Sequence, residues 1–316
     1  MPSYLELRRR MEERDRGLRE KVVSLSEACR LIRDGDHVAV GGCHYSRTPS
    51  AMIWEIIRQQ KRNLTFSRSI TSTEGDLLLV AGATRHIITS WFSPAVTYGV
   101  SKVMRHYTQS GEARFEEWSH LSMGLRYRAG AMGVPFIPIR TMMGSDVIRQ
   151  LPEVKELECP YTGEKLVLLP ALNPDVALIH VQRADPYGNG QWDGLPFMDA
   201  DIALAATRVI ITTERLVSNE QIRRAPDQTR IPFFCVDAVV EVPYGCVPHE
   251  CYGLYEPDFD HLDEYVKVMM GQGVEGVQGY LREYVEGPAS WEEFLAKVGV
   301  QHLLKISAAG RRMSYD

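Results

Sequence analysis

Short apolar runs alternate with helical patterns along most of this chain, and this alternation limits its possible folds more than any other feature. The run His37–Val40 precedes a pattern at 49–59 whose apolar residues share one helical face. The second half repeats the order, with an apolar run at 174–184, a helical pattern at 200–208 and a further apolar run at 209–217. The alternation predicts an α/β fold: an open, mostly parallel sheet covered by helices on both faces.

The patterns divide the 316 residues into three segments. Residues 1–21 are densely charged and predict an exposed helix or arm. Residues 22–256 carry the alternating pattern of the α/β domain. Residues 257–316 are charged and helical, which predicts a C-terminal extension over the core.

Charge and cysteine usage exclude several classes of protein. The formal net charge of -5 provides no general attraction to nucleic acid or to anionic membranes. No apolar run is long enough to predict a membrane span, and the charged N-terminus lacks the apolar core of a secretory signal. The six cysteines form no CxxC pair, so we expect a reduced, cytoplasmic protein.

Ligands of open parallel sheets bind at the carboxyl ends of strands, which here directs attention to five loops. These loops are predicted at 41–48, 67–76, 91–97, 140–146 and 182–192. In the first, Gly41 and Gly42 permit a tight turn and a close backbone approach, as phosphate loops need. The pair matches neither the dinucleotide fingerprint nor the P-loop, so a plain turn is an equal alternative.

Three side chains near these loops could take part in catalysis, and each also has a purely structural interpretation. Cys43 could be a nucleophile, but His44 is adjacent and points to the opposite face of an extended chain, so we favour packing. Glu74 could act as nucleophile or base, and here we favour a helix start capped by Ser72, Thr73 or Asp76. His120 could share a helical face with Glu116 and transfer protons if a helix begins before them. With Ser119 as the N-cap, His120 is instead a partly exposed histidine at a helix start, an equal alternative.

A fourth pattern, Cys246-Val-Pro-His249-Glu-Cys251, places three potential metal ligands within six residues. A tetrahedral site would need a fourth ligand from elsewhere. We favour a turn with buried thiols, and so expect no metal.

Taken in order, several segments resemble the class I coenzyme A transferases, in particular the A (alpha) subunit of glutaconate CoA-transferase. The resemblance covers roughly residues 22–256. It rests on "GDHVAVGGCHYSRTPSAM", "PFIPIRTMMGSD", "PDVALIHVQRADPYGNGQW", "DADIALAATR", "ITTERLVSNEQIRR" and "VDAVVEVPYGCVPHECYGLY".

The resemblance implies a heteromer of A and B subunits, A2B2 or larger, with the active site at their interface. It implies a ping-pong reaction: a glutamate that belongs to the B subunit first attacks an acyl-CoA and forms a mixed anhydride. The glutamate then becomes a glutamyl-CoA thioester and passes CoA to a carboxylic acid, expected to be a dicarboxylic one. The CoA thioester is a substrate, and no permanently bound cofactor is expected.

On this reading the chain contributes a wall of the acyl pocket. The residues expected to bind substrate are Gly41, Gly42, His44, Arg47, Ser69, Ser72 and Ser93, with His120 and Glu74 as candidate catalytic groups. The resemblance departs at His120, where glutaconate-type A chains tend to carry Gln. A titratable histidine there leaves open a CoA-thioester hydrolase or a C–C lyase on the same scaffold. A non-catalytic subunit that stabilises an active partner is the third alternative.

Overall fold

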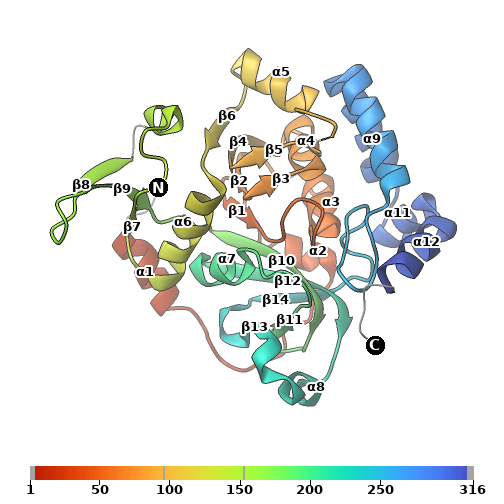
Figure 1. The fold of residues 1–316 in the computed structure, drawn as a ribbon. Coiled ribbons are helices and arrows are strands. Elements are labelled where there is room, and N and C mark those ends of the chain that lie inside the picture. Colours follow the sequence, from red (N-terminus) through yellow and green to blue (C-terminus); the bar gives the residue numbers. More distant parts are fainter. Residues whose placement is uncertain (1–3, 95–96, 152–153, 312–316) are drawn as a thin grey trace.

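A nine-stranded sheet forms the centre of the protein in a computed structural model, which describes residues 4–94, 97–151 and 154–311 (Figure 1). Seven of its strands are parallel. In spatial order they are β14 (Ala238–Glu241), β12 (Arg208–Leu216), β10 (Val176–Ala184), β1 (His37–Val40), β2 (Leu64–Ser67), β4 (Thr84–Thr89) and β6 (Arg114–Glu117). The antiparallel strands β11 (Gly190–Gln191) and β13 (Thr229–Ile231) extend the end of β10.

Alternate residues of the same strands enter two separate hydrophobic cores, one on each face of the sheet. Val38 and Val40 of β1 belong to one core, and Ala39 between them belongs to the other. Side chains of a strand point alternately to opposite faces, so continuous apolar runs are the mark of a sheet buried on both sides. The predicted two-sided parallel sheet is therefore confirmed.

Helices and a small sheet complete the two cores. The first core receives side chains from α2 (Leu25–Cys29), α3 (Ser50–Arg58), α4 (Thr73–Val80) and α5 (Lys102–Ser110). It also receives the C-terminal helices α9 (Phe259–Gln272), α10 (Val274–Tyr280), the π-helical turn η4 (Leu281–Glu286), α11 (Trp291–Val298) and α12 (Val300–Gly310).

The second core is covered by α6 (His120–Met132), α7 (Asp199–Ala205) and a three-stranded antiparallel sheet. That sheet has the order β7 (Phe136–Ile139), β9 (Lys165–Pro170) and β8 (Lys155–Glu158), and it projects from the main body in Figure 1. The remaining elements are α1 (Tyr4–Glu12), α8 (Asn219–Arg224), the paired strands β3 (Ile70–Thr71) and β5 (Trp91–Phe92), and the 3-10 turns Asp146–Gln150, Pro226–Gln228 and Phe233–Cys235. Within the described ranges, no helix is both long and apolar enough to cross a bilayer.

The strand order reverses between β1 and β10. From β1 the chain adds β2, β4 and β6 on one side, and from β10 it adds β12 and β14 on the other. In open sheets of this kind, such a reversal is the place where ligands are expected to bind, at the carboxyl ends of the two strands. The glycine pair at 41–42 directly follows β1 and so lies at this reversal.

One local prediction differs from the structure. The stretch around Glu116 forms strand β6, and helix α6 begins only at His120. The Glu116 carboxylate accepts a hydrogen bond from His86 Nε2 at 2.9 Å and pairs with Arg114 at 2.8 Å, so it does not share a helical face with His120. The predicted N-cap is confirmed, because Ser119 Oγ accepts a hydrogen bond from the Ser122 amide at 3.1 Å.

A buried carboxyl group connects helix α9 to helix α4 and to the start of α5. Asp76 of α4 is fully buried, and it accepts hydrogen bonds from Ser101 Oγ at 2.6 Å and from the Tyr265 hydroxyl of α9 at 3.0 Å. Burial raises the pKa of this carboxyl to about 7, although both hydrogen bonds oppose the shift. Asp76 therefore holds a proton in the folded protein at pH values where it has lost that proton in the unfolded chain.

We predict that Asp76 makes the protein less stable as pH rises from about 4 to about 7, where only the folded state keeps this proton. Asp76→Asn cannot ionise and should remove that part of the pH dependence. Urea unfolding of both proteins across this range measures the effect, and Asp227→Asn at an exposed position is the control. Identical slopes of unfolding free energy against pH in wild type and Asp76→Asn would contradict the prediction.

Candidate active site

Three loops meet at the carboxyl edge of the sheet, and we call them together the strand-end site. They comprise residues 41–48 after β1, 68–72 after β2 and 90–94 after β4. The His44 amide donates to Ile70 O at 3.3 Å, and His44 Nε2 donates to Pro94 O at 2.9 Å. The first loop therefore contacts both of the others directly.

The buried guanidinium of Arg68 fixes the positions of these loops. Its Nε donates to Gly41 O at 3.2 Å, and one terminal nitrogen donates to Thr48 Oγ1 at 3.0 Å. The other terminal nitrogen lies 2.6 Å from Glu74 Oε1, in an ion pair that is almost completely buried. Sequence reasoning missed Arg68, although a single arginine among small polar residues at a strand end was the available signal.

Glu74 is an anchor in this geometry through Oε1, while its Oε2 is buried without a hydrogen-bond partner among the described residues. Besides Arg68, its Oε1 accepts the Ser72 amide at 2.9 Å, which is one of the free amides at the start of α4. The predicted capping groups have other partners: Ser72 Oγ lies 3.5 Å from Pro94 O, Thr73 Oγ1 contacts His249, and Asp76 contacts Ser101. That capping prediction was wrong because Glu74 itself reaches back to the helix start. A catalytic role for Glu74 stays a prediction.

The glycine pair forms a tight turn whose amides are already used. The Gly41 amide donates to Leu178 O at 2.9 Å, and the Gly42 amide donates to Asp199 Oδ1 at 3.0 Å. Gly42 has a φ of 66°, and a Cβ there would lie 2.1 Å from Ser46 O. Because bound phosphate needs free amides, the arrangement favours the plain turn over a phosphate loop.

Arg47 is an internal brace. It is fully buried, with Nη1 donating to Leu195 O at 2.8 Å and Nη2 lying 3.3 Å from Asp199 Oδ2. Its guanidinium carbon also lies 5.1 Å and 5.2 Å from the ring centres of Trp192 and Phe197. Arg47 and Gly42 thus both hold Asp199 at the start of α7, and direct contact between Arg47 and a substrate stays a prediction.

The other predicted pocket residues lie together at the strand-end site. Cys43 and His44 are partly exposed, whereas Ser69, Ser72 and Ser93 are buried in the isolated chain. The Ser69 hydroxyl is in hydrogen-bonding contact with the Cys43 thiol, and burial raises the pKa of that thiol. A raised pKa lowers the thiolate fraction, which argues against Cys43 as a nucleophile.

His120 lies apart from these groups but at the same edge of the sheet. It is the first residue of α6, which follows β6, and its side chain is exposed. An exposed histidine at this edge is accessible to a substrate or to a second chain. The structure thus brings the loop residues together and leaves His120 at the rim.

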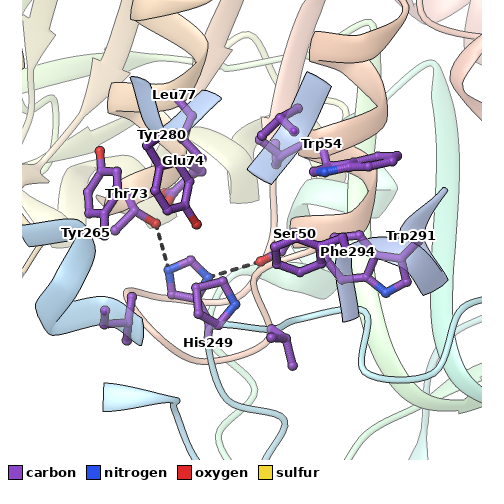
Figure 2. A pocket seen from close by; sticks show the side chains of 15 residues that line it. Ser50, Trp54, Thr73, Glu74, Leu77, His249, Tyr265, Tyr280, Trp291 and Phe294 are labelled. Carbon is purple, nitrogen blue, oxygen red and sulfur yellow. Dashed lines mark hydrogen bonds between the residues drawn. The ribbon is translucent and has the colours of Figure 1, made fainter. Parts of the chain in front are cut away.

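Behind the strand-end site lies a cavity of about 40 Å³, shown in Figure 2. Its walls are mostly apolar and include Trp54, Trp291 and Phe294. On its polar side His249 Nε2 lies 3.0 Å from Thr73 Oγ1, and Nδ1 lies 3.1 Å from Ser50 Oγ (Figure 2). Since both ring nitrogens have these partners, His249 does not join Cys246 and Cys251 in a metal site.

Comparison with known proteins agrees with this fold. The sequence model of the coenzyme A transferase family matches residues 22–242, so the chain belongs to that family. The chain is 35% identical over 303 residues to the A subunit of glutaconate CoA-transferase from Acidaminococcus fermentans, covering 90% of this chain and 94% of that one. The crystal structure of that glutaconate coenzyme A-transferase superposes with a TM-score of 0.86, at 34% identity and with 90% and 95% of the two chains covered.

Further relatives include a second CoA-transferase subunit, a decarboxylase and a hydrolase subunit. The chain is 34% identical to the A subunit of 3-oxoadipate CoA-transferase from Pseudomonas knackmussii, over 88% of this chain and 98% of that one. An uncharacterized protein of Archaeoglobus fulgidus is 38% identical over 91% of this chain, which spans 64% of that protein's length. The structure of a cysteine-to-serine variant of the decarboxylase AibA/AibB matches with a TM-score of 0.73 at 31% identity, over 84% and 100% of the chains. A cholesterol ring-cleaving hydrolase IpdA subunit of Rhodococcus jostii is 28% identical over 88% of this chain and 91% of that one.

We predict that Gly42→Ala destabilises the protein by about 2–4 kcal/mol, because the residue combines a positive φ with a backbone clash. Gly35→Ala is the matched control, with a φ of 85° and no atom within 4 Å of the added Cβ, and should cost about 1 kcal/mol. Denaturant unfolding measures both. Equal losses of unfolding free energy in the two variants would show that the close contact between a Cβ at position 42 and Ser46 O does not destabilise the protein.

Proposed function

We propose that this chain is the A subunit of a heteromeric CoA-transferase that moves CoA between an acyl-CoA and a carboxylic acid. Family membership supports the activity class, and both transferase relatives described above are named as A subunits. Glutaconate and 3-oxoadipate are both dicarboxylates, so a dicarboxylic acid is our first choice of substrate. The complex would be A2B2 or larger.

One observation carries the proposal: the strand-end site has no free carboxylate nucleophile among its described residues. Glu74, which adjoins the second loop, is buried and paired with Arg68 at 2.6 Å. Transfer of CoA through an anhydride needs a carboxylate that can attack the thioester carbonyl. We therefore assign that carboxylate to a glutamate of the B subunit.

In this mechanism the partner's glutamate oxygen attacks the acyl-CoA carbonyl and the CoA thiolate leaves, which gives a mixed anhydride. The thiolate then attacks the glutamyl carbonyl and releases the acyl group as a carboxylate. The acceptor acid repeats these steps in reverse and takes the CoA. In this mechanism the chain positions the acyl group. The turn at 41–46 and the serines at 69, 72 and 93 form one wall of the acyl pocket.

We predict that borohydride inactivates the assembled A–B complex only after incubation with an acyl-CoA in the absence of acceptor acid. Borohydride reduces the glutamyl thioester to an alcohol, and peptide mass spectrometry should locate this change on the B chain. The complex treated without acyl-CoA is the control. Reduction at Glu74 of this chain would instead assign the nucleophile here, and turnover with no trapped residue would favour a hydrolase or lyase.

The hydrolase or C–C lyase is the second candidate, because His120 is exposed at the carboxyl edge of the sheet. On that reading His120 is the acid or base, and we predict that His120→Ala lowers kcat by about 10²–10⁴-fold. His106→Ala, at an exposed site on α5, is the matched control. Unchanged kcat in His120→Ala would remove the acid–base role.

The third candidate is a non-catalytic subunit that stabilises an active partner. Full activity after combined substitution of His44, Ser69 and Ser72 would favour this role.

A further inference from the structure

Four potential metal ligands converge on the far side of the β1–β10 reversal from the strand-end site. They are His180 of β10, Glu214 of β12, and Cys246 and Cys251 of the loop that follows β14. One ligand atom from each lies within 4.8 Å of all the others. His180 and both cysteines are fully buried, and the Glu214 side chain is only 7% exposed.

We propose that these four side chains bind one zinc ion as a structural site. Two thiolates, one imidazole and one carboxylate form a four-ligand set of the kind that zinc takes up in tetrahedral geometry. With zinc bonds of roughly 2.0–2.3 Å, the ligand atoms of a tetrahedron are roughly 3.3–3.8 Å apart. The widest separations therefore need to close by about 1 Å, and the His180–Glu214 pair, at 2.9 Å, needs to widen by roughly 0.4 Å to hold the ion.

The groups around the cluster hold these ligands in place. Thr212 Oγ1 lies 2.9 Å from His180 Nδ1, which leaves Nε2 to face Glu214 at 2.9 Å. Glu214 Oε2 accepts the Tyr244 amide at 2.6 Å, and Oε1 accepts the Gly245 amide at 3.0 Å and the Tyr255 hydroxyl. Such outer contacts are typical of metal ligands, because they fix ring orientation and carboxylate position.

Access and proton balance are both compatible with zinc. Glu214 also lines an open cavity of about 910 Å³, which provides an entry path for the ion. Zinc replaces the two thiol protons and the proton held between His180 Nε2 and Glu214 Oε1, and the displaced protons pass to solvent. In the zinc-bound form the neutral imidazole keeps one proton on Nδ1, and this N–H donates a hydrogen bond to Thr212 Oγ1.

The site would secure the loop that supports the strand-end site. The Ala51 amide donates to Gly245 O at 3.0 Å, and Ser50 Oγ donates to Cys246 O at 2.8 Å. The Arg47 amide donates to Glu250 O at 3.0 Å, and the Glu250 amide donates to Tyr45 O at 2.8 Å. Zinc between the two cysteines would thus restrain the segment 245–251 and, through it, residues 45–51.

The test is metal analysis of the full chain purified under reducing conditions, together with Co²⁺ substitution after chelation. We expect one zinc per chain, thiolate-to-cobalt charge-transfer bands and the visible bands of tetrahedral Co²⁺. Cys246→Ser and Cys251→Ser should each lose the bands, whereas Cys29→Ser, equally buried but outside the cluster, should keep them. Zinc removal should increase amide hydrogen exchange in 45–51 and 245–251.

Wild-type protein keeps the test decisive if the cysteine variants do not fold. Folded wild type that holds no zinc, and that shows no thiolate–cobalt bands on titration with Co²⁺, would overturn the proposal. The cluster would then be a metal-free hydrogen-bonded network. These readouts do not involve CoA, so their outcome is independent of the transferase proposal.

Discussion

The buried guanidinium of Arg68 is the interaction on which the arrangement of the strand-end site depends. A charge removed from water costs several kcal/mol unless its donors meet well-placed acceptors. Arg68 meets the Gly41 carbonyl, the Thr48 hydroxyl and the Glu74 carboxylate, which come from the end of β1, the start of α3 and the first turn of α4. These segments therefore cannot move apart without exposing an unpaired buried charge. The buried contacts of Arg68 thus fix the geometry of the site within this chain, without a contribution from a substrate or a second subunit.

The sheet could be predicted from the sequence because its central strands are buried on both faces. Such strands are continuous apolar runs, and Val38, Ala39 and Val40 show this directly, since they serve two different cores. Strand β6 was missed for the opposite reason. It lies at the edge of the sheet, and three of its four residues are charged, so the apolar signal is absent. Strand β8, with four exposed residues, gives no apolar pattern either.

The loops at the strand ends were predictable from the sequence, but the side-chain pairings within them were not. Strand ends and the glycine pair located the loops, because these features depend only on local sequence. Arg47 was expected to bind substrate and Glu74 was a candidate catalytic group. In the isolated chain each is buried against a partner of opposite charge, Asp199 and Arg68, which the sequence did not predict. Nothing in a local pattern tells which carboxylate a buried arginine will meet. The same holds for Cys246 and Cys251, whose neighbours His180 and Glu214 come from two other strands.

The packing of the C-terminal helices bears on when the protein can finish folding during synthesis. Trp54 of α3 donates its indole N–H to Tyr284 O at 2.9 Å, and its ring packs edge-on against Trp291. The core on that face of the sheet is therefore closed by residues that leave the ribosome about 230 positions after Trp54. Until they emerge, apolar side chains of α3 and α4 stay open to water, and exposed apolar surface of this kind promotes aggregation. Folding of this face of the sheet is therefore delayed until the helices that begin at Phe259 have been synthesised.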